Sequence, residues 1–245
     1  MKIYFIGAGP GDPELLTIKA AEAISRADII IYAVSLVNKA VLKFAPPSAS
    51  VFDSSRMTLN EVLRIFRKAK AGKKIIARVH SGDPSLYGAI QEQISWCDKE
   101  EVKYEVIPGV SSFCAGAAAL KQELTLPDIS QTVIITRLPG RTKVPEKEDL
   151  KRLARIRATL VIFLSAEYIK KVVDQLLQGY CPDTPAAIVY RASWPDERII
   201  KGTLKDIAEK VRRAGIKKQT LIFVGDVLKK RGFTKSVLYS DNRDK

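Results

Sequence analysis

Glycine, proline and aspartate recur in three short segments that could build a binding site for a nucleotide-like ligand. Residues 7–13 (GAGPGDP) follow an apolar run directly, and residues 82–88 (GDPSLYG) leave a second apolar run through another Gly-Asp-Pro turn. A third segment, 108–113 (PGVSSF), offers two hydroxyls and backbone amides near a helix start. Glycine permits positive φ and lets a ligand approach the main chain closely. The three segments therefore predict a site built mainly from backbone.

Side chains that could transfer protons are scarce beside these segments. His80 lies two residues before the second segment, and Asp53 follows a short apolar pair, so both are candidates for a general acid or base. An ordinary strand-end residue is the alternative for His80, and a turn cap is the alternative for Asp53. The three cysteines are far apart with no C-x-x-C pair, and His80 is the only histidine, so no metal site is predicted.

The first segment differs from the familiar phosphate-binding loops. A dinucleotide fingerprint needs glycine where the chain has Asp12, and it needs an acidic residue near the end of the second apolar run, where the chain has Ala33. No Gly-Lys-Ser/Thr follows, which excludes a P-loop. The common methyltransferase motif usually has an acidic residue two positions before its first glycine, and here that residue is Phe5. A different kind of loop is therefore expected.

Composition limits the class of protein. The chain has 245 residues, 46% hydrophobic and 28% charged, which is ordinary for a soluble protein with one large core or two smaller ones. No apolar run approaches the roughly 20 residues of a membrane span, and no signal-type segment is evident, so we expect a cytoplasmic protein without membrane attachment. The net charge of +14 predicts an acidic partner, such as nucleic acid, an anionic surface or a polycarboxylate.

The elements that must position these residues form two groups. Strands are predicted in the first half at residues 2–6, 29–32, 74–79 and 104–107, with helices between them that suit right-handed crossovers. Asp12 and Pro13 can cap the first helix, a capping box at 58–61 opens a helix to about residue 71, and small residues predict a helix over 112–120.

The second half has more strands per helix. Strands are predicted at 132–136, 159–163, 186–190, 197–201 and 220–224, and helices near 147–157, 166–177 and 204–214. The fold class is therefore α/β with two α/β domains, residues 1–121 around a mainly parallel sheet and residues 130–245 around a mixed sheet. The active site is expected in the cleft between the domains.

Taken in order along the chain, these motifs resemble those of the tetrapyrrole (corrin/porphyrin) methylases, the class III S-adenosylmethionine-dependent methyltransferases. The resemblance runs nearly end to end and rests on residues 3–13, 82–88, 108–113 and 202–204. Segments 32–37, 53–59, 136–142 and 190–197 are similar to the branch of that family that methylates C-11 of precorrin-4 in cobalamin biosynthesis. Such a reaction needs two ligands held in a near-attack geometry and no side-chain nucleophile, which suits this chain.

The resemblance implies S-adenosyl-L-methionine as methyl donor, a tetrapyrrole with several carboxylates as substrate, and a homodimer. Carried over residue by residue, the cofactor contacts fall on Pro10, Gly82, Asp83, Leu86, Ser111, Ser112, Leu164, Ala192 and Gly225. Turn geometry is the alternative for Pro10 and Gly82, and ordinary packing is the alternative for Leu164 and Ala192.

Arginine forks suit carboxylates better than lysine, so the substrate is expected to be held by Arg56, Arg137, Arg141 and Arg191. Ion pairing within the protein is the alternative for each of them. Another tetrapyrrole methylase, acting on precorrin-2 at C-20 or on uroporphyrinogen III, and a basic nucleic-acid-associated protein are the competing functions. Basic residues cluster at 64–74, 210–218 and 229–231, where the first two clusters follow amphipathic helical patterns that favour a solvated helix face. Few aromatic residues lie beside these clusters, which disfavours nucleic acid as a partner. Metal-free and cobalt-loaded macrocycles both stay open as substrates.

Overall fold

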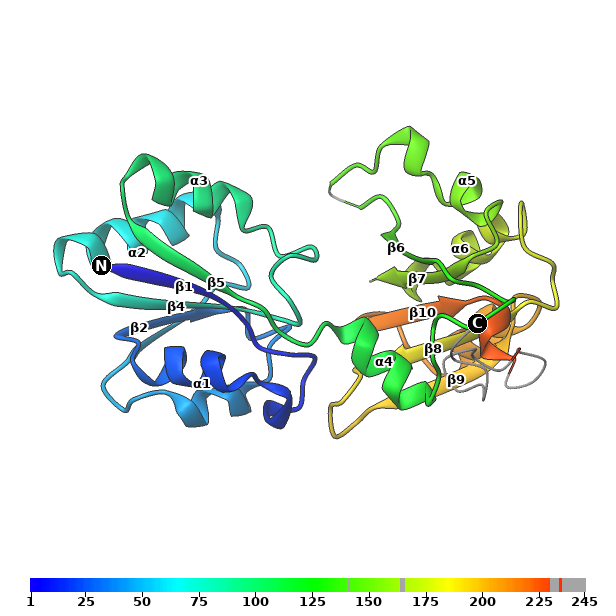
Figure 1. Ribbon diagram of the computed structural model, residues 1–245, viewed down its shortest axis with the longest axis horizontal. Helices are drawn as coiled ribbons and strands as arrows, with labels where there is room; N and C mark the ends of the chain where they lie inside the picture. The colour runs from blue at the N-terminus through cyan, green and yellow to red at the C-terminus, as the bar shows by residue number, and fades with distance from the viewer. Residues whose placement is uncertain (141, 164–165, 230–233, 235–245) are drawn as a thin grey trace, which may run out of the picture. The chain divides into compact units, whose positions relative to one another are not determined.

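The chain divides into two compact units, Met1–Ala115 and Gly116–Lys245. A computed structural model describes residues 1–140, 142–163, 166–229 and 234. Each unit is built around its own five-stranded sheet with helices packed against it (Figure 1). One sheet is parallel and the other is mixed, which confirms the predicted pair of α/β domains.

The sheet of the first unit is parallel throughout and has the strand order β3-β2-β4-β1-β5. Its strands are β1 Lys2–Gly7, β2 Ile29–Tyr32, β3 Ser50–Asp53, β4 Ile75–His80 and β5 Lys103–Ile107. β1 lies between β4 and β5, so the three strands that precede the glycine-rich segments are neighbours. Because parallel strands end at the same edge, the three segments leave the sheet side by side.

Helices cover both faces of this parallel sheet. α1 Ile18–Ser25 and the 3₁₀ segment η2 Lys39–Phe44 pack on one face, whereas α2 Leu59–Ala71 and α3 Gln91–Lys99 pack on the other (Figure 1). Along β4, the side chains of Ala77 and Val79 belong to the core that α1 and η2 cover, whereas that of Ile76 belongs to the core that α2 and α3 cover. Since side chains alternate along a strand, Arg78 and His80 lie on the face covered by α2 and α3.

Two local predictions for this unit differ from the structure. Asp12 caps only the 3₁₀ turn η1 Pro13–Leu15, and α1 starts afterwards, where the Thr17 hydroxyl accepts a hydrogen bond from the Ala20 amide. The short edge strand β3 was missed because Val51 is exposed and the strand lacks a continuous apolar run. The capping box is confirmed, since Thr58 and Glu61 each bond the other's backbone amide.

The sheet of the second unit has the order β6-β7-β10-β8-β9. Its strands are β6 Val133–Arg137, β7 Thr159–Phe163, β8 Pro185–Tyr190, β9 Arg198–Thr203 and β10 Thr220–Val224. β6 and β7 are parallel, whereas the pairs that involve β8, β9 and β10 are antiparallel.

Three α-helices and three 3₁₀ segments accompany this sheet within the described residues. They are α5 Leu150–Ala154, α6 Ile169–Leu176, α7 Ile207–Arg213, η3 Glu146–Glu148, η4 Ala166–Tyr168 and η5 Asp226–Leu228. Leu160, Ile162 and Ile188 of the strands pack with apolar residues of the helices, among them Val172, into one core. Among the described residues, no helix is both long and apolar enough to cross a membrane.

The boundary between the two units falls within α4 Ser112–Leu120. Gly116 lies against β10, because a Cβ at this position would stand only 2.7 Å from the Phe223 ring. The second half of α4 therefore packs with the second unit. This contact explains why the units divide before residue 121, the predicted end of the first domain.

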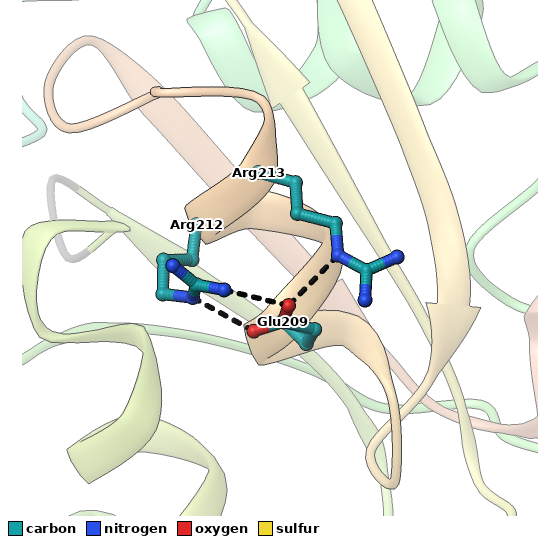
Figure 2. Close-up of polar contacts among 3 residues, drawn as sticks. All are labelled: Glu209, Arg212 and Arg213. Atoms are coloured by element: carbon teal, nitrogen blue, oxygen red, sulfur yellow. Dashed lines mark hydrogen bonds and ion pairs between the residues drawn. The ribbon is translucent and has the colours of Figure 1, made fainter.

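Part of the positive charge is neutralised locally on the surface. On α7, the Glu209 carboxylate accepts hydrogen bonds from Arg212 Nε and Nη2 and from Arg213 Nε, each at 2.8 Å (Figure 2). Bonds from Arg212 and then Arg213 lower the pKa of Glu209 to about 2. The basic cluster of α7 is therefore a set of exposed ion pairs, in line with the solvated helix face that its amphipathic pattern favours.

Candidate active site

Three glycines bring the carboxyl ends of β4, β1 and β5 into direct backbone contact. A Cβ on Gly7 would stand 2.6 Å from the Gly109 amide nitrogen and 2.7 Å from the Gly82 carbonyl oxygen, and a Cβ on Gly109 would also collide with that oxygen. Gly9 and Gly82 exchange two backbone hydrogen bonds, at 3.2 and 2.8 Å. Only glycine tolerates this approach, and both Gly9 and Gly82 have positive φ. The main chain thus fixes the geometry of this edge.

Asp83 ties two of the glycine-rich segments together. One carboxylate oxygen accepts the Gly109 amide at 2.9 Å, and the other accepts the Ser85 amide at 2.8 Å and the Ser85 hydroxyl. Burial would raise the pKa of Asp83, but the bonds from Ser85 and Gly109 outweigh it and lower the pKa overall. Asp83 is therefore ionised at neutral pH and anchors the loop.

The six predicted cofactor residues of the first unit lie on the loops that these contacts organise. Pro10 and Gly82 are buried, and Ser111 is 7% exposed. A Cβ on Gly82 would meet the Ser112 amide at 3.5 Å, so the second and third segments run in contact. The Leu86 amide bonds the Asp83 carbonyl within its own turn. Backbone groups and serine hydroxyls dominate this surface, as a ligand held mainly by the main chain requires.

The strand register separates the predicted cofactor residues of the second unit. Ala192 follows β8 at the end where Tyr190 pairs with Thr220, the first residue of β10. Gly225 follows the other end of β10 and donates its amide to the Pro185 carbonyl. Gly225 lies five residues after Thr220, which at about 3.4 Å per residue is a separation of roughly 17 Å. Ala192 and Gly225 therefore lie beyond opposite ends of β10, and both stay predicted contacts. The positive φ of Gly225 favours glycine at this position. Leu164 lies outside the described residues.

The predicted substrate arginines occupy different environments. Arg56 is exposed and makes no hydrogen bond or ion pair with any described residue. Arg137 donates to the carbonyls of its own loop, those of Leu138, Thr142 and Lys143. Arg191 pairs with Asp196 and stacks on Trp194 at 3.9 Å. Arg137 and Arg191 thus organise loops within the second unit, and Arg141 lies outside the described residues.

Asp53 holds two loops of the first unit together. Its Oδ1 accepts the amide of Val34 at 3.2 Å, the amide of Ser55 at 2.8 Å and the Ser55 hydroxyl at 2.6 Å. Bonds from the Ser55 hydroxyl, then from the amides of Ser55 and Val34, lower the pKa of Asp53. An ionised carboxylate with these partners serves as the turn cap that was the alternative for this residue, and at neutral pH it has no proton to donate.

His80 ends β4 beneath the glycine-rich edge. The residue is 8% exposed, and its Nε2 is buried with no hydrogen-bond partner in the described structure. Burial, and then the charge of Arg78, lower the pKa of His80 to about 3. The imidazole is therefore neutral near pH 7 and too weak a base to exchange protons efficiently there.

The sequence prediction overlooked Arg78, the residue that adjoins His80 on the same face. Its guanidinium reaches Gln93, the Ile31 carbonyl and Ser54. The only local signal was an arginine inside the apolar run of residues 75–79, since a charge in a buried strand needs a reason.

Comparisons with known proteins decide the family. The family model for tetrapyrrole (corrin/porphyrin) methylases matches residues 2–208. The chain belongs to this family. A cobalt-precorrin-4 C(11)-methyltransferase of Methanocaldococcus jannaschii is 54% identical to this tetrapyrrole methylase over 98% of the chain and 93% of the relative. A precorrin-4 C(11)-methyltransferase of Pseudomonas aeruginosa is 46% identical over 98% of the chain and 95% of the relative.

Solved structures of tetrapyrrole methylases have the same fold. One described as a cobalt precorrin-4 methyltransferase of cobalamin biosynthesis matches with a TM-score of 0.90 and 44% identity, over 93% of this chain and 95% of that one. Among relatives compared by sequence, an S-adenosyl-L-methionine-dependent uroporphyrinogen III methyltransferase of Methanosarcina barkeri is more distant, at 35% identity over 93% of the chain and 92% of the relative.

Proposed function

We propose that this tetrapyrrole methylase transfers a methyl group from S-adenosyl-L-methionine to C-11 of precorrin-4 or of its cobalt complex. The observation that carries the proposal is the ranking of relatives. Proteins named for C-11 methylation of this substrate are 46% and 54% identical over nearly the full length, against 35% for a uroporphyrinogen III methyltransferase. Methylation of a different macrocycle carbon is therefore the weaker alternative.

The glycine-rich edge of the first unit is the part of the chain that fits the methyl donor. When bound, S-adenosyl-L-methionine supplies a sulfonium methyl group that a nucleophilic macrocycle carbon takes, with S-adenosyl-L-homocysteine as the leaving group. Ser111 and Ser112, beside Gly82, offer backbone and hydroxyl groups for the donor, and Gly82 with no side chain lets the donor approach the main chain. Asp83 stays ionised and keeps the loop in place. Leu164, Ala192 and Gly225 stay predicted contacts of the donor.

Placement supplies the catalysis in this proposal. The lowered pKa values of Asp53 and His80 make both groups weak bases, and neither carries an acidic proton to donate near pH 7, so neither is assigned a proton-transfer step. Arg56 is exposed, makes no ion pair with a described residue, and is assigned to a substrate carboxylate. The positive net charge of the chain would favour approach of an anionic macrocycle.

Methyl transfer to defined tetrapyrroles tests the proposal. Purified protein is incubated with the donor and with precorrin-4, cobalt-precorrin-4, precorrin-2 or uroporphyrinogen III, and products are analysed by mass spectrometry. We expect one added methyl group on one or both forms of precorrin-4 and none on the other macrocycles. Methylation of uroporphyrinogen III or precorrin-2 alone would assign the chain to another branch. Salt-sensitive duplex binding without a calorimetric signal for the donor would favour the nucleic-acid alternative.

We also propose that the protein is a homodimer of the cytoplasm, as the family resemblance implies. Light scattering after size exclusion should then give about twice the 27.1 kDa mass of one chain. Fractionation of the source cells should recover the protein with soluble cytoplasmic markers. A mass of one chain, or recovery with membranes, would contradict the respective part of the proposal.

A further inference from the structure

Arg78 is a partly buried cation whose described hydrogen-bond partners are all neutral. Its Nε donates to Gln93 Oε1 at 3.1 Å, and its Nη1 donates to the Ile31 carbonyl at 3.2 Å and to Ser54 Oγ at 3.1 Å. No carboxylate in the described part of the chain forms an ion pair with it. Burial lowers the pKa of Arg78 to about 10, so the side chain keeps its charge at neutral pH.

A charge that is partly withdrawn from water and has no counterion is costly to a fold. Methionine or leucine would fill a strand position among Phe5, Ile31 and Ile76 without that cost. The arginine therefore needs a role that an apolar residue could not perform. The three acceptors indicate where that role lies, because Gln93 belongs to α3, Ile31 to β2 and Ser54 to the turn after β3.

The hydrogen bonds of Arg78 connect two loops of the candidate site. Ser54 opens the 53–57 turn, which carries Arg56, and its carbonyl accepts the Met57 amide within that turn. On the other side, Gln93 is 4% exposed and donates its amide nitrogen to the Ala89 carbonyl at 3.0 Å. Ala89 belongs to the 82–89 loop, which begins at the glycine contact. Arg78 and Gln93 thus form a continuous bridge from one loop to the other.

The two loops differ in how much they depend on this bridge. The 82–89 loop is also fixed by the exchange of hydrogen bonds between Gly9 and Gly82 and by Asp83 on the Gly109 amide. The 53–57 turn is exposed at Ser55 and Arg56. Its other ties are the Ser54 amide, which donates to the Tyr32 carbonyl at 2.8 Å, and the bonds of Asp53 and Ser55 to residues 34 and 35. Loss of Arg78 should therefore release the turn and leave the glycine-rich edge intact.

We propose that Arg78, through Gln93 and Ser54, is a positioning residue that sets the 53–57 turn, and with it Arg56, against the 82–89 loop. The inference rests on the proposed function at one point, the assignment of Arg56 to a substrate carboxylate. Its consequence is a separation of effects: substrate affinity depends on Arg78, whereas affinity for the methyl donor does not.

The test compares Arg78→Met, Arg78→Lys and Ser54→Ala with Arg67→Met, an exposed arginine on α2 that serves as control. Arg78→Met should raise KM for the tetrapyrrole by about tenfold or more, as loss of a charge-assisted hydrogen bond does. The Kd for S-adenosyl-L-methionine should stay within about twofold. Ser54→Ala combined with Arg78→Met should be no worse than Arg78→Met alone. Arg78→Lys keeps the positive charge but loses the planar guanidinium with its several donors. Its KM for the tetrapyrrole should therefore lie between those of the wild type and Arg78→Met.

Hydrogen exchange gives a readout that needs no substrate. In Arg78→Met and Ser54→Ala, the amides of residues 54–57 should exchange about tenfold faster, while those of Gly9 and Gly82 keep their wild-type rates. Unchanged exchange in residues 54–57, or equal losses of tetrapyrrole and donor affinity, would overturn the proposal. A wild-type protein that methylates no tetrapyrrole would instead refute the proposed function, and exchange would still decide the role of Arg78. If Arg78→Met fails to fold, Ser54→Ala and Arg78→Lys carry the same measurements.

Discussion

The glycine-rich edge of the first unit and the arginine-bearing loops of the second unit are held in place by different means. At the carboxyl edge of the parallel sheet in the first unit, Gly7, Gly82 and Gly109 put backbone against backbone. In the second unit, long side chains do this work: Arg137 bonds three carbonyls of its loop, and Arg191 stacks on Trp194 and pairs with Asp196. In these loops, glycine allows a close approach of two backbones that any larger residue would prevent, whereas arginine holds a loop through the hydrogen bonds of its side chain.

The same contrast divides the arginines assigned to the substrate from sequence. Arg137 and Arg191 are occupied by their own loops, while Arg56 of the first unit is exposed and makes no ion pair with a described residue. A guanidinium that already has partners loses them when it binds a carboxylate, so its net gain is smaller. Arg56 is therefore the arginine for which we expect the clearest effect on substrate binding.

The largest effect should come from adding one methyl group to the backbone contact. In Gly109→Ala the new Cβ would collide with the Gly82 carbonyl, and we expect destabilisation of about 3 kcal/mol together with loss of donor binding. Gly140→Ala in the second unit is the matched control, since nothing lies within 4 Å of its Cβ. Urea unfolding and calorimetry measure both. If the two variants were equally stable, the close backbone contact at Gly109 would not be what fixes the glycine-rich edge.

Replacing arginines should separate binding from loop stability. Arg56→Ala is expected to raise KM for the tetrapyrrole by about 10- to 100-fold and to leave the free energy of unfolding within about 0.5 kcal/mol. Arg137→Ala should instead lower the free energy of unfolding by about 1 kcal/mol, because loop carbonyls lose their donor. Steady-state kinetics and urea unfolding of both variants provide the measurement. The reverse pattern would assign the substrate contact to Arg137.

Acidification should reveal the neutral state of His80. Its pKa is about 3 in the fold and about 6.5 when unfolded, so between these values protons favour the unfolded chain. Stability from this group is complete above pH 6.5 and is lost as the pH falls. Between pH 7.5 and 5.0 the wild type should lose about 2 kcal/mol more than His80→Asn in urea unfolding. Parallel pH dependence of the two proteins would contradict the assignment.

The smallest effect is expected at the ion pairs of α7 in the second unit. Glu209→Gln should lengthen retention on a cation exchanger at low salt, because Arg212 and Arg213 lose their shared partner. Glu148→Gln removes the same charge from an exposed position where the carboxylate forms no ion pair with a described arginine, and should change retention less. Equal shifts for the two variants would mean that Glu209 does not mask its neighbours.

Local sequence signals predicted the parts of the fold that depend on local geometry. The Gly-Asp-Pro turns and the apolar runs before them placed three loops at one sheet edge, and the capping box placed the start of α2. The edge strand β3 has one exposed valine and no apolar run, so it carried no such signal.

The features that local sequence signals did not place depend on contacts between distant segments. The antiparallel register of β8 and β10 puts Gly225 at the opposite end from Ala192, and nothing local to either residue encodes that register. Arg78 meets Ile31, Ser54 and Gln93 only after β2, the turn after β3, and α3 have assembled around β4. The presence of an arginine within an apolar run was the only local sequence signal for this residue.

Transfer of a ¹³C-labelled methyl group tests the central claim most directly. The protein is incubated with S-adenosyl-L-methionine labelled at its methyl carbon and with precorrin-4 or cobalt-precorrin-4, and the product is examined by NMR. Our account predicts one labelled methyl group on the quaternary carbon C-11. Label at another macrocycle carbon, or no label in any tetrapyrrole although the donor binds, would contradict it.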